Sequence, residues 1–495
     1  MQHLSKSKII SGWQCAKKLW LEVHDPDRAE VDPALERIFE LGHEVGELAR
    51  RLFPGGVLIG HDHRLDEALA ETAARLGAPG PVTLFEATFR HEGVLIRADV
   101  IERSADGAIR LVEVKAGTKV KPVNYIDCAV QNWVLTGLGL APDRIELAHI
   151  NNQFVYAGDG EYDGILKFVD LTEESRAAAA EVSRWVDDNR RLLAGPLPEI
   201  HIGPQCTNPY DCPFIPWCTP PQPPYPVRRL PGRGKVMWEL IEAGIEDIRD
   251  IPAGRLTNPT QEWVRRVTQE GRAELKPGAA AQLGEMGWPR YYLDFETVAF
   301  AVPVWAGTRP YEALPFQWSC HVEHPDGRLE HREWLAAGDE PPMRACAETL
   351  LAGLDEGGPI FTYTGYEARV LKTLAERFPD LASALAGLEA RLFDLHPLTK
   401  QTYYHPDMRG SWSIKAVLPT LDADMRYDAL GEIQEGGSAS QAFLEILQPD
   451  LPATRRRQLR KDLIDYCAYD TLALVRLAET LRGERPPRPV AVTGA

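Results

Sequence analysis

The sequence predicts a mixed α/β protein with two domains joined by a helical connector. Its 495 residues exceed what a single hydrophobic core usually organises, and a composition of 44% hydrophobic and 26% charged residues is typical of globular proteins. In each half, short runs with the two-residue period of strands alternate with longer runs of helical period. Between the halves, residues 213–234 contain too many prolines to continue a helix or a central strand. We therefore expect a domain boundary there.

The first half contains the elements of one α/β domain, which we assign to residues 1–225. Apolar residues at helical spacing predict helices, and alternating or β-branched runs predict strands. The expected elements are a helix over 34–53, strands over 82–90, 93–102 and 109–115, a helix over 124–137, a strand within 146–157 and an amphipathic helix over 172–194.

The second half begins with a helical connector, residues 226–288, and continues with a second α/β domain over 289–485. The proline-rich residues 486–495 predict a disordered tail. The expected elements of the second domain are a strand over 290–300, a strand followed by a helix within 357–377, and a long closing helix over 454–482.

Charge and cysteine content limit the class of protein. A net charge of −17 opposes long-range attraction to a polyanion, but two runs of basic residues provide local positive charge. The absence of a long apolar segment predicts a cytoplasmic protein without a membrane partner. In such a chain, eight cysteines favour metal ligation or buried thiols over disulfides. The basic runs are Arg228, Arg229, Arg233 and Lys235, and Arg455, Arg456, Arg457, Arg460 and Lys461.

Four cysteines form a candidate metal site. Cys206, Cys212 and Cys218 are separated by five residues each within the proline-rich segment, and Cys15, flanked by lysines that favour a thiolate, is the expected fourth ligand. Structural zinc sites usually pair cysteines two to four residues apart. The longer spacing therefore favours a structural 4Fe-4S cluster, with zinc as the alternative.

Acidic residues at the centre of the first domain form a second candidate site. Asp99 lies on one predicted strand and Glu113 and Lys115 on the next, where side chains two residues apart share a face. Two carboxylates beside a lysine suit Mg²⁺ or Mn²⁺ and a water to be activated. A surface ladder of ion pairs is the alternative. His43 lies in the preceding predicted helix and Gln131 in the following one.

This pattern of acids and cysteines resembles the RecB-type PD-(D/E)XK nucleases, in particular their iron–sulfur branch, which includes the CRISPR adaptation nuclease. The resemblance covers residues 1–225 and implies a restriction-endonuclease-like fold. It also implies that His43, Asp99 and Glu113 bind metal, that Lys115 acts on the attacking water and that Gln131 contacts substrate.

A third candidate site lies in the second domain. Asp294 and Glu296 share one face of a strand, and Tyr466 and Asp470 are one helical turn apart. This pair of motifs resembles the DEDDy exonucleases, which have an RNase H-like fold. The resemblance implies that Asp294, Glu296 and Asp470 bind two metal ions and that Tyr466 orients the nucleophile.

The resemblance to the DEDDy exonucleases is less complete at its second motif. Glu367 stands where an aspartate is expected, and it would be a further metal ligand. Asp394 is an acid near a strand end that could complete the site. Ser413 and Lys415 are candidate phosphate contacts.

Together the motifs predict a metal-dependent nuclease with two active sites. DNA is the expected partner rather than RNA, with single-stranded ends as the substrate, and exonuclease action is expected rather than endonuclease action. Trp13, Trp133 and Trp217 could stack on bases. The alternatives are a non-catalytic nucleic-acid-binding or assembly module with degenerate sites, and an RNA exonuclease.

Overall fold

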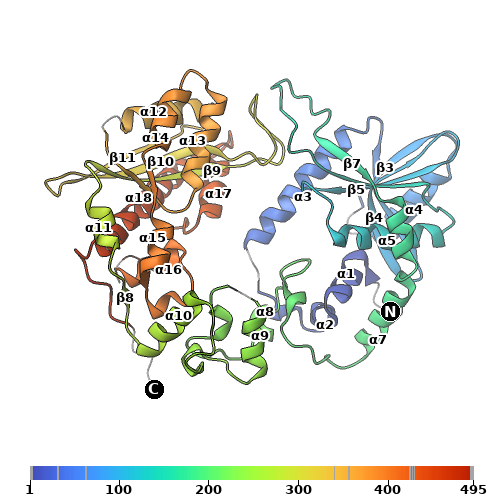
Figure 1. The fold of residues 1–495 in the computed structure, drawn as a ribbon. Coiled ribbons are helices and arrows are strands. Elements are labelled where there is room, and N and C mark those ends of the chain that lie inside the picture. The colour runs from blue at the N-terminus through green and yellow to red at the C-terminus, as the bar shows by residue number, and fades with distance from the viewer. Residues whose placement is uncertain are drawn as a thin grey trace. The chain divides into compact units, whose positions relative to one another are not determined.

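The computed structural model has a mixed α/β fold, as the sequence predicts, and divides into two compact units. It describes residues 4–30, 33–61, 64–232, 234–338, 340–354, 357–422, 425, 427 and 430–490. The N-terminal unit consists of Met1–Pro220 and Phe300–Glu312, and the C-terminal unit of Pro221–Ala299 and Ala313–Ala495. Figure 1 shows a sheet with covering helices in each unit.

A seven-stranded mixed sheet forms the centre of the N-terminal unit. Its order is β2-β3-β4-β5-β6-β7, and β1 pairs with β4. The central β5 runs antiparallel to β4 and parallel to β6. The strands are β1 (Leu4–Ser5), β2 (Val57–Leu58), β3 (Val82–His91), β4 (Val94–Arg103), β5 (Ile109–Lys115), β6 (Arg144–Ile150) and β7 (Leu166–Asp170).

Helices cover both faces of this sheet. Leu111 of β5 packs in a core with helices α1, α4 and α5, whereas the next residue, Val112, packs with Val45 and Leu48 of α3 on the other face. Glu113, two residues after Leu111, therefore faces α1 and α5. The helices are α1 (Lys6–Gln14), α2 (Ala16–His24), α3 (Pro33–Arg51), α4 (Leu65–Gly77), α5 (Pro122–Gly137), α6 (Thr172–Ala179), α7 (Val182–Ala194) and α8 (Ile215–Cys218).

A five-stranded mixed sheet organises the C-terminal unit, in the order β11-β10-β9-β12-β13. The central β9 pairs antiparallel with β10 and parallel with β12, and β12 is parallel to β13. The strands are β9 (Arg290–Val298), β10 (Leu314–Glu323), β11 (Leu329–Leu335), β12 (Ile360–Thr362) and β13 (Leu392–Asp394).

The long helix α18 lies against one face of this sheet. The amide of Gln317 on β10 donates to the carbonyl of Leu463 (2.9 Å), while Trp318, the next residue, donates to Thr349 of α12 on the opposite face. The helices are α12 (Met343–Gly353), α13 (Tyr366–Arg377), α14 (Ala382–Glu389), α15 (Leu395–Thr402), α16 (Ile414–Val417), α17 (Gly436–Ile446) and α18 (Ala453–Leu481).

The predicted connector shares a hydrophobic core with the C-terminal sheet domain. Leu240, Val264 and Leu283 from the connector pack with Tyr403 and Leu477. The connector also contributes strand β8 (Glu274–Leu275), which pairs antiparallel with β14 (Tyr403–Tyr404). Its helices are α9 (Lys235–Glu242), α10 (Pro259–Glu270) and α11 (Ala279–Gly284).

Most expected elements occur close to their predicted bounds, with local differences. The helix expected over 172–194 is two helices, α6 and α7. Arg488, in the segment expected to be disordered, pairs with Asp407 (2.7 Å), and residues 491–495 and Arg233 lie outside the described residues. None of the helices that the structure describes is long and apolar enough to cross a membrane.

Candidate active sites

The first acid cluster lies on β4 and β5 of the N-terminal unit. Asp99 accepts a hydrogen bond from the backbone N–H of Val114 (2.7 Å), which holds its carboxylate against β5. Glu113 is only 1% exposed, and the ammonium of Lys115 contacts its Oε1 atom. The structure therefore brings Asp99, Glu113 and Lys115 together, as the strand alternation predicts.

Two further charged residues complete this cluster. Lys6, on α1, lies 3.0 Å from Glu113 Oε1 and 2.7 Å from Asp127 Oδ1. Asp127, on α5, also lies 2.9 Å from the ammonium of Lys115. The cluster thus alternates two lysines with two carboxylates, and the charges of Glu113 and Asp127 are neutralised within the protein.

The pKa values follow from this arrangement. Burial would lower the pKa of Lys6 and Lys115, but the charges of Asp127 and Glu113 more than offset it, so both pKa values are raised. Burial would raise the pKa of Asp127, yet the two lysines lower it below its usual value. Asp99 differs, because burial and the charge of Glu113 raise its pKa to about 7. Asp99 is therefore the acid of this cluster whose ionised form a bound cation would stabilise most.

A cavity of about 440 Å³ opens beside Asp99. Its walls include Asp99 and His43, so these predicted ligands share one space. The walls also include Glu86 of β3, a residue that sequence reasoning missed. Glu86 has a left-handed backbone (φ 54°), which is uncommon and strained for a residue other than glycine, and burial raises its pKa. It is a further candidate ligand at this site.

Gln131, expected to contact substrate, is fully buried on α5. Its amide donates to Glu113 Oε2 (2.6 Å) and to Asp127 Oδ1 (3.2 Å). Residues 124, 127 and 131 share one face of this otherwise apolar helix. In this structure Gln131 therefore positions the acids.

The second acid cluster lies on the face of β9 that packs against α18. Asp294 and Glu296 project from this face, and α18 brings Tyr466, Cys467 and Asp470 to it. One ligand atom each of Asp294, Glu296 and Cys467 lies within 4.8 Å of the others, and the Cys467 thiol is 3.7 Å from Asp294 Oδ2. The strand and the closing helix thus meet at the acids, an arrangement that the resemblance to the DEDDy exonucleases implies.

Glu367 joins this cluster from the first turn of α13. It is 3% exposed, and its Oε2 atom has no hydrogen-bond partner among the described residues. Burial and the charge of Asp294 raise its pKa to about 9. An isolated buried carboxylate oxygen is costly, and coordination of a cation would remove that cost. The longer side chain at the expected aspartate position therefore reaches the other acids.

The remaining carboxylates of the cluster also have raised pKa values. Burial raises the pKa of Asp294, with a further contribution from Asp470, and the pKa of Glu296, with contributions from Asp294 and Asp470. Burial raises the pKa of Asp470 to about 6, although hydrogen bonds from Tyr427 and Tyr466 oppose the shift. Among the described residues, no lysine or arginine forms an ion pair with these acids. A cluster of unpaired buried carboxylates binds protons or metal ions more readily than a cluster that is paired with lysines.

Tyr427 is a member of this site that sequence reasoning missed. Its hydroxyl donates to Asp470 Oδ1, and its ring lies 5.4 Å below the ammonium of Lys415. Lys415 donates to the carbonyl of Gln434 (2.9 Å) and lowers the pKa of Glu296 and Asp470. Lys415 therefore lies within electrostatic reach of the acids without pairing with them.

Asp394 has a structural role at the edge of the cluster. It caps α15, and its Oδ1 atom accepts hydrogen bonds from the backbone N–H groups of His396 (2.9 Å) and Thr364 (2.8 Å). Its charge contributes to the raised pKa of Glu367. Asp394 thus ties the turn that precedes Glu367 to the start of α15.

The four cysteines line one small cavity in the N-terminal unit. Cys15, Cys206, Cys212 and Cys218 come from two distant segments, which Gln14 joins by donating to the carbonyls of Gln205 (2.8 Å) and Tyr210 (2.7 Å). Burial raises the pKa of Cys212 and Cys218, and the neighbouring cysteines raise both further. Four convergent thiols are the ligand set of a 4Fe-4S cluster or of zinc.

The three predicted stacking tryptophans have different surroundings. Trp13 is exposed. Trp133 donates to Ser183 (2.9 Å), and Trp217 is covered by the cations of Lys17 and Arg28. Only Trp13 therefore presents an open ring in this structure.

Comparison with known proteins identifies one domain family. Residues 291–413 match a domain of unknown function, DUF2779. This segment includes Asp294, Glu296, Glu367 and Asp394 but ends before α18. No curated protein matches the chain. A solved structure titled "Crystal structure of SSO0001" is 12% identical over 40% of this chain and 79% of its own, with a TM-score of 0.22. A similarity at that score carries no argument about function.

Proposed function

We propose that the chain is a metal-dependent nuclease that hydrolyses phosphodiester bonds, with single-stranded DNA ends as the substrate. The observation that carries the proposal is the second acid cluster, where Asp294, Glu296, Glu367 and Asp470 converge and no lysine or arginine of the described residues forms an ion pair with them. Protein structures seldom retain several uncompensated carboxylates in one place unless a metal ion compensates them.

The ligand set is consistent with Mg²⁺ or Mn²⁺. These hard cations prefer carboxylate oxygens, and two of the four acids, Asp294 and Asp470, are partly exposed and can meet a substrate. Bound metal would supply Lewis-acid stabilisation of the phosphate oxygens. Asp294, Glu296, Glu367 and Asp470 would hold it, and this assignment agrees with the DEDDy-like motifs and an RNase H-like fold.

The surrounding side chains prepare this site. Tyr427 and Tyr466 donate to Asp470 and so fix the direction of its carboxylate. Lys415 places a positive charge beside the acids, where it can attract a phosphate of the substrate. The Tyr466 hydroxyl remains our candidate for orienting the attacking water.

We assign the N-terminal unit to the RecB-like iron–sulfur nucleases. Asp99, His43 and Glu86 surround one cavity and would hold metal there. Glu113, on the neighbouring strand, would be a further ligand, and Lys115 would act on the attacking water. The four cysteines would hold a structural 4Fe-4S cluster that ties α2 to the proline-rich segment. Cluster loading is tested by the absorbance and iron content of protein purified without oxygen, with Cys15→Ser as the depleted variant.

The activity is tested with end-labelled single-stranded oligonucleotides. We expect purified protein to shorten DNA in Mg²⁺ or Mn²⁺ but not in EDTA, and to cut RNA of the same sequence more slowly. Asp294→Asn and Glu113→Gln separate the two sites, and Asp465→Asn, on the exposed side of α18, is the matched control. Cleavage that persists unchanged in the double variant Glu113→Gln/Asp294→Asn would reject the proposal.

A further inference from the structure

A surface of the C-terminal unit carries dense positive charge in a protein whose net charge is −17. Two cavities, of about 580 and about 380 Å³, share His396 and Lys400 in their walls and so adjoin one another. We call the two cavities together the basic groove. Among the residues that the structure describes, no aspartate or glutamate lines either of them. The cationic walls are Lys276, Lys400, Arg228, Arg229 and Arg409, together with His396.

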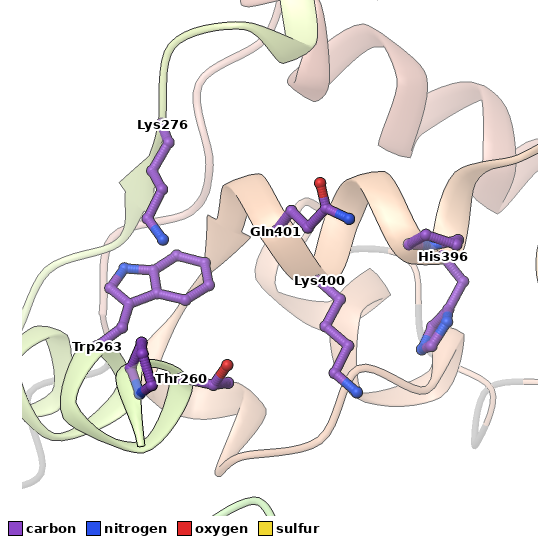
Figure 2. A pocket seen from close by; sticks show the side chains of 8 residues that line it. Thr260, Trp263, Lys276, His396, Lys400 and Gln401 are labelled. Carbon is purple, nitrogen blue, oxygen red and sulfur yellow. The ribbon is translucent and has the colours of Figure 1, made fainter. Parts of the chain in front are cut away.

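The fold brings these cations together from separate segments. His396 and Lys400 are one turn apart on α15 and project from one side of it, as Figure 2 shows. Lys276 follows β8 and lies over the ring of Trp263, 3.3 Å from its centre. On the other side of His396 and Lys400, the turn at Arg409 packs on the segment of Arg228 and Arg229.

That turn is tightly fixed. Arg409 has a left-handed backbone (φ 47°), which is uncommon for an arginine. A Cβ atom added to the next residue, Gly410, would lie 2.0 Å from the carbonyl oxygen of Arg229. Only glycine permits this approach, and it places Arg409 beside Arg229. Backbone strain of this kind is commonly retained where a side chain must be held in place for function.

The cations of the basic groove are free of carboxylates. The nearby acids are engaged elsewhere, since Glu274 pairs with Arg266 and Asp407 with Arg488. Within the described part of the chain, none of the five cations lies within 4.0 Å of a carboxylate oxygen.

The second basic run of the sequence is different. Arg455 binds Glu432 and Glu445, and Lys461 binds Asp465. Those charges stabilise the protein, whereas the charges of the basic groove remain available to a ligand.

Two segments of the chain connect the basic groove to the second acid cluster. Asp394 joins His396 to the turn before Glu367 by its two hydrogen bonds. From Arg409 to Ser413 the chain lines the groove, and two residues later Lys415 lies within electrostatic reach of Glu296 and Asp470. A ligand lying in the groove would therefore end near the acids.

We propose that the basic groove binds the phosphodiester backbone of a single nucleic-acid strand and leads its end to the acid cluster of the C-terminal unit. This inference rests on the proposed nuclease function. A row of unpaired cations suits a repeating anion better than one small anion. A single strand is flexible enough to follow the two adjoining cavities, whereas a duplex is stiff over this length.

The test is binding of a fluorescent 20-nucleotide single strand to the full chain in EDTA, followed by anisotropy. Each phosphate contact lowers the slope of log K against log salt by about 0.7, so it contributes about fivefold at 0.1 M salt. We expect Lys400→Glu to weaken binding at least about fivefold and the double variant Arg228→Glu/Arg229→Glu roughly twentyfold. Arg457→Glu, an exposed residue with the same charge change, is the matched control and should bind like the wild type.

Binding of DNA and RNA strands of the same sequence shows which nucleic acid the groove prefers. An equal loss of affinity for both strands in the groove variants would support recognition of phosphate alone. Lys400→Gln and a thermal melt of each variant separate lost contacts from misfolding, because Lys400 is exposed and its removal should leave the melting temperature unchanged.

If Lys400→Glu and Arg457→Glu bind equally well, the groove is not the binding site. Competition by pyrophosphate as strong as by the strand, at equal phosphate, would also overturn the proposal. Groove-dependent binding without cleavage in Mg²⁺ or Mn²⁺ would instead reject the nuclease function and leave the groove in place.

Discussion

The two acid clusters solve the same electrostatic problem in different ways. In the N-terminal unit, Lys6 and Lys115 pair with Glu113 and Asp127, so the protein supplies its own countercharge. In the C-terminal unit, Asp294, Glu296, Glu367 and Asp470 have no such partner among the described residues, and their pKa values are raised. Similar acid motifs can therefore differ greatly in how strongly they favour metal binding. The difference lies in residues outside the motifs.

This difference predicts unequal roles for the two sites. A buried carboxylate that already pairs with a lysine gains less from a metal ion, because coordination must compete with the existing ion pair. Uncompensated carboxylates gain both the attraction of the ion and relief from mutual repulsion. We therefore expect the C-terminal site to bind divalent metal more tightly and to contribute more of the cleavage.

The largest effect is expected for Glu367→Gln. A metal site is worth several kcal/mol of transition-state stabilisation, and 1.36 kcal/mol corresponds to a tenfold rate, so cleavage should fall about a thousandfold. Because Glu367 carries an unpaired buried oxygen, the same variant should melt at a higher temperature in EDTA. Loss of activity together with loss of stability in EDTA would contradict this account.

The next largest effect is expected for Lys6→Met in the N-terminal unit, and it is a loss of stability. Removing one partner of a buried ion pair typically costs about 3–5 kcal/mol, because the other charges stay buried. Urea denaturation monitored by circular dichroism measures the free energy of unfolding. Lys8→Met, on the same helix, serves as the control. A loss below about 1 kcal/mol would mean that Glu113 and Asp127 do not depend on Lys6.

The pH dependence of stability should also reflect the raised pKa values of the C-terminal cluster. Folded-state pKa values of about 6 for Asp470 and about 9 for Glu367 exceed the ordinary values near 4, so the folded protein binds more protons than the unfolded chain between these limits. The contribution of these two acids to the stability of the metal-free protein should therefore be greatest near pH 4 and fall as the pH rises to 9. Each pKa unit corresponds to about 1.4 kcal/mol.

Divalent metal should reverse this trend, because it favours the ionised acids. Melting curves from pH 5 to 9, in EDTA and in Mn²⁺, should show a stabilisation by Mn²⁺ that grows with pH. Asp294→Asn should reduce that growth, and Glu113→Gln should change it less. A stabilisation that is independent of pH would count against the C-terminal site.

The smallest effect is expected for Tyr427→Phe. The hydroxyl of Tyr427 donates to Asp470 and lowers its pKa, so its removal should raise that pKa by about one unit. The acidic limb of the pH–rate profile should move to higher pH, with little change at the plateau. An unchanged limb would show that Asp470 does not limit the rate at low pH.

The sequence predicts the acids better than it predicts what surrounds them. Asp294 and Glu296 lie on a strand with strong periodicity, and alternation of side chains is enough to place them on one face. Asp470 lies on a helix with strong periodicity, and the packing of α18 on the sheet brings it to them. Lys6 could not be predicted, because its partner Glu113 is 107 residues away and is reached only through the packing of α1 on the sheet. Asp127 had a usable signal, since it is the one charged residue of the largely buried helix α5.

Other features depend on tertiary structure alone. Tyr427 lies outside any periodic segment, and the basic groove combines cations from the connector with cations from α15 and the turn at Arg409. Strands β10 and β11 were not predicted, although β10 carried a usable signal. Its apolar residues occur at every second position, which is the period of a strand, and it pairs with β9. The alternating residues are Leu314, Phe316, Trp318, Cys320 and Val322.

The residues between β9 and β10 determine which fragments of the chain can fold as complete units. Residues 300–312 belong to the N-terminal unit, where the backbone of Tyr156 exchanges hydrogen bonds with Gly307 and Thr308 and Tyr311 donates to the carbonyl of Ala116, directly after Lys115. The polypeptide therefore passes from one unit to the other at three places, and no single truncation releases either unit intact. A fragment ending at Pro220 would lack part of its own packing, so loss of activity in such a fragment would not show that its catalytic residues are idle.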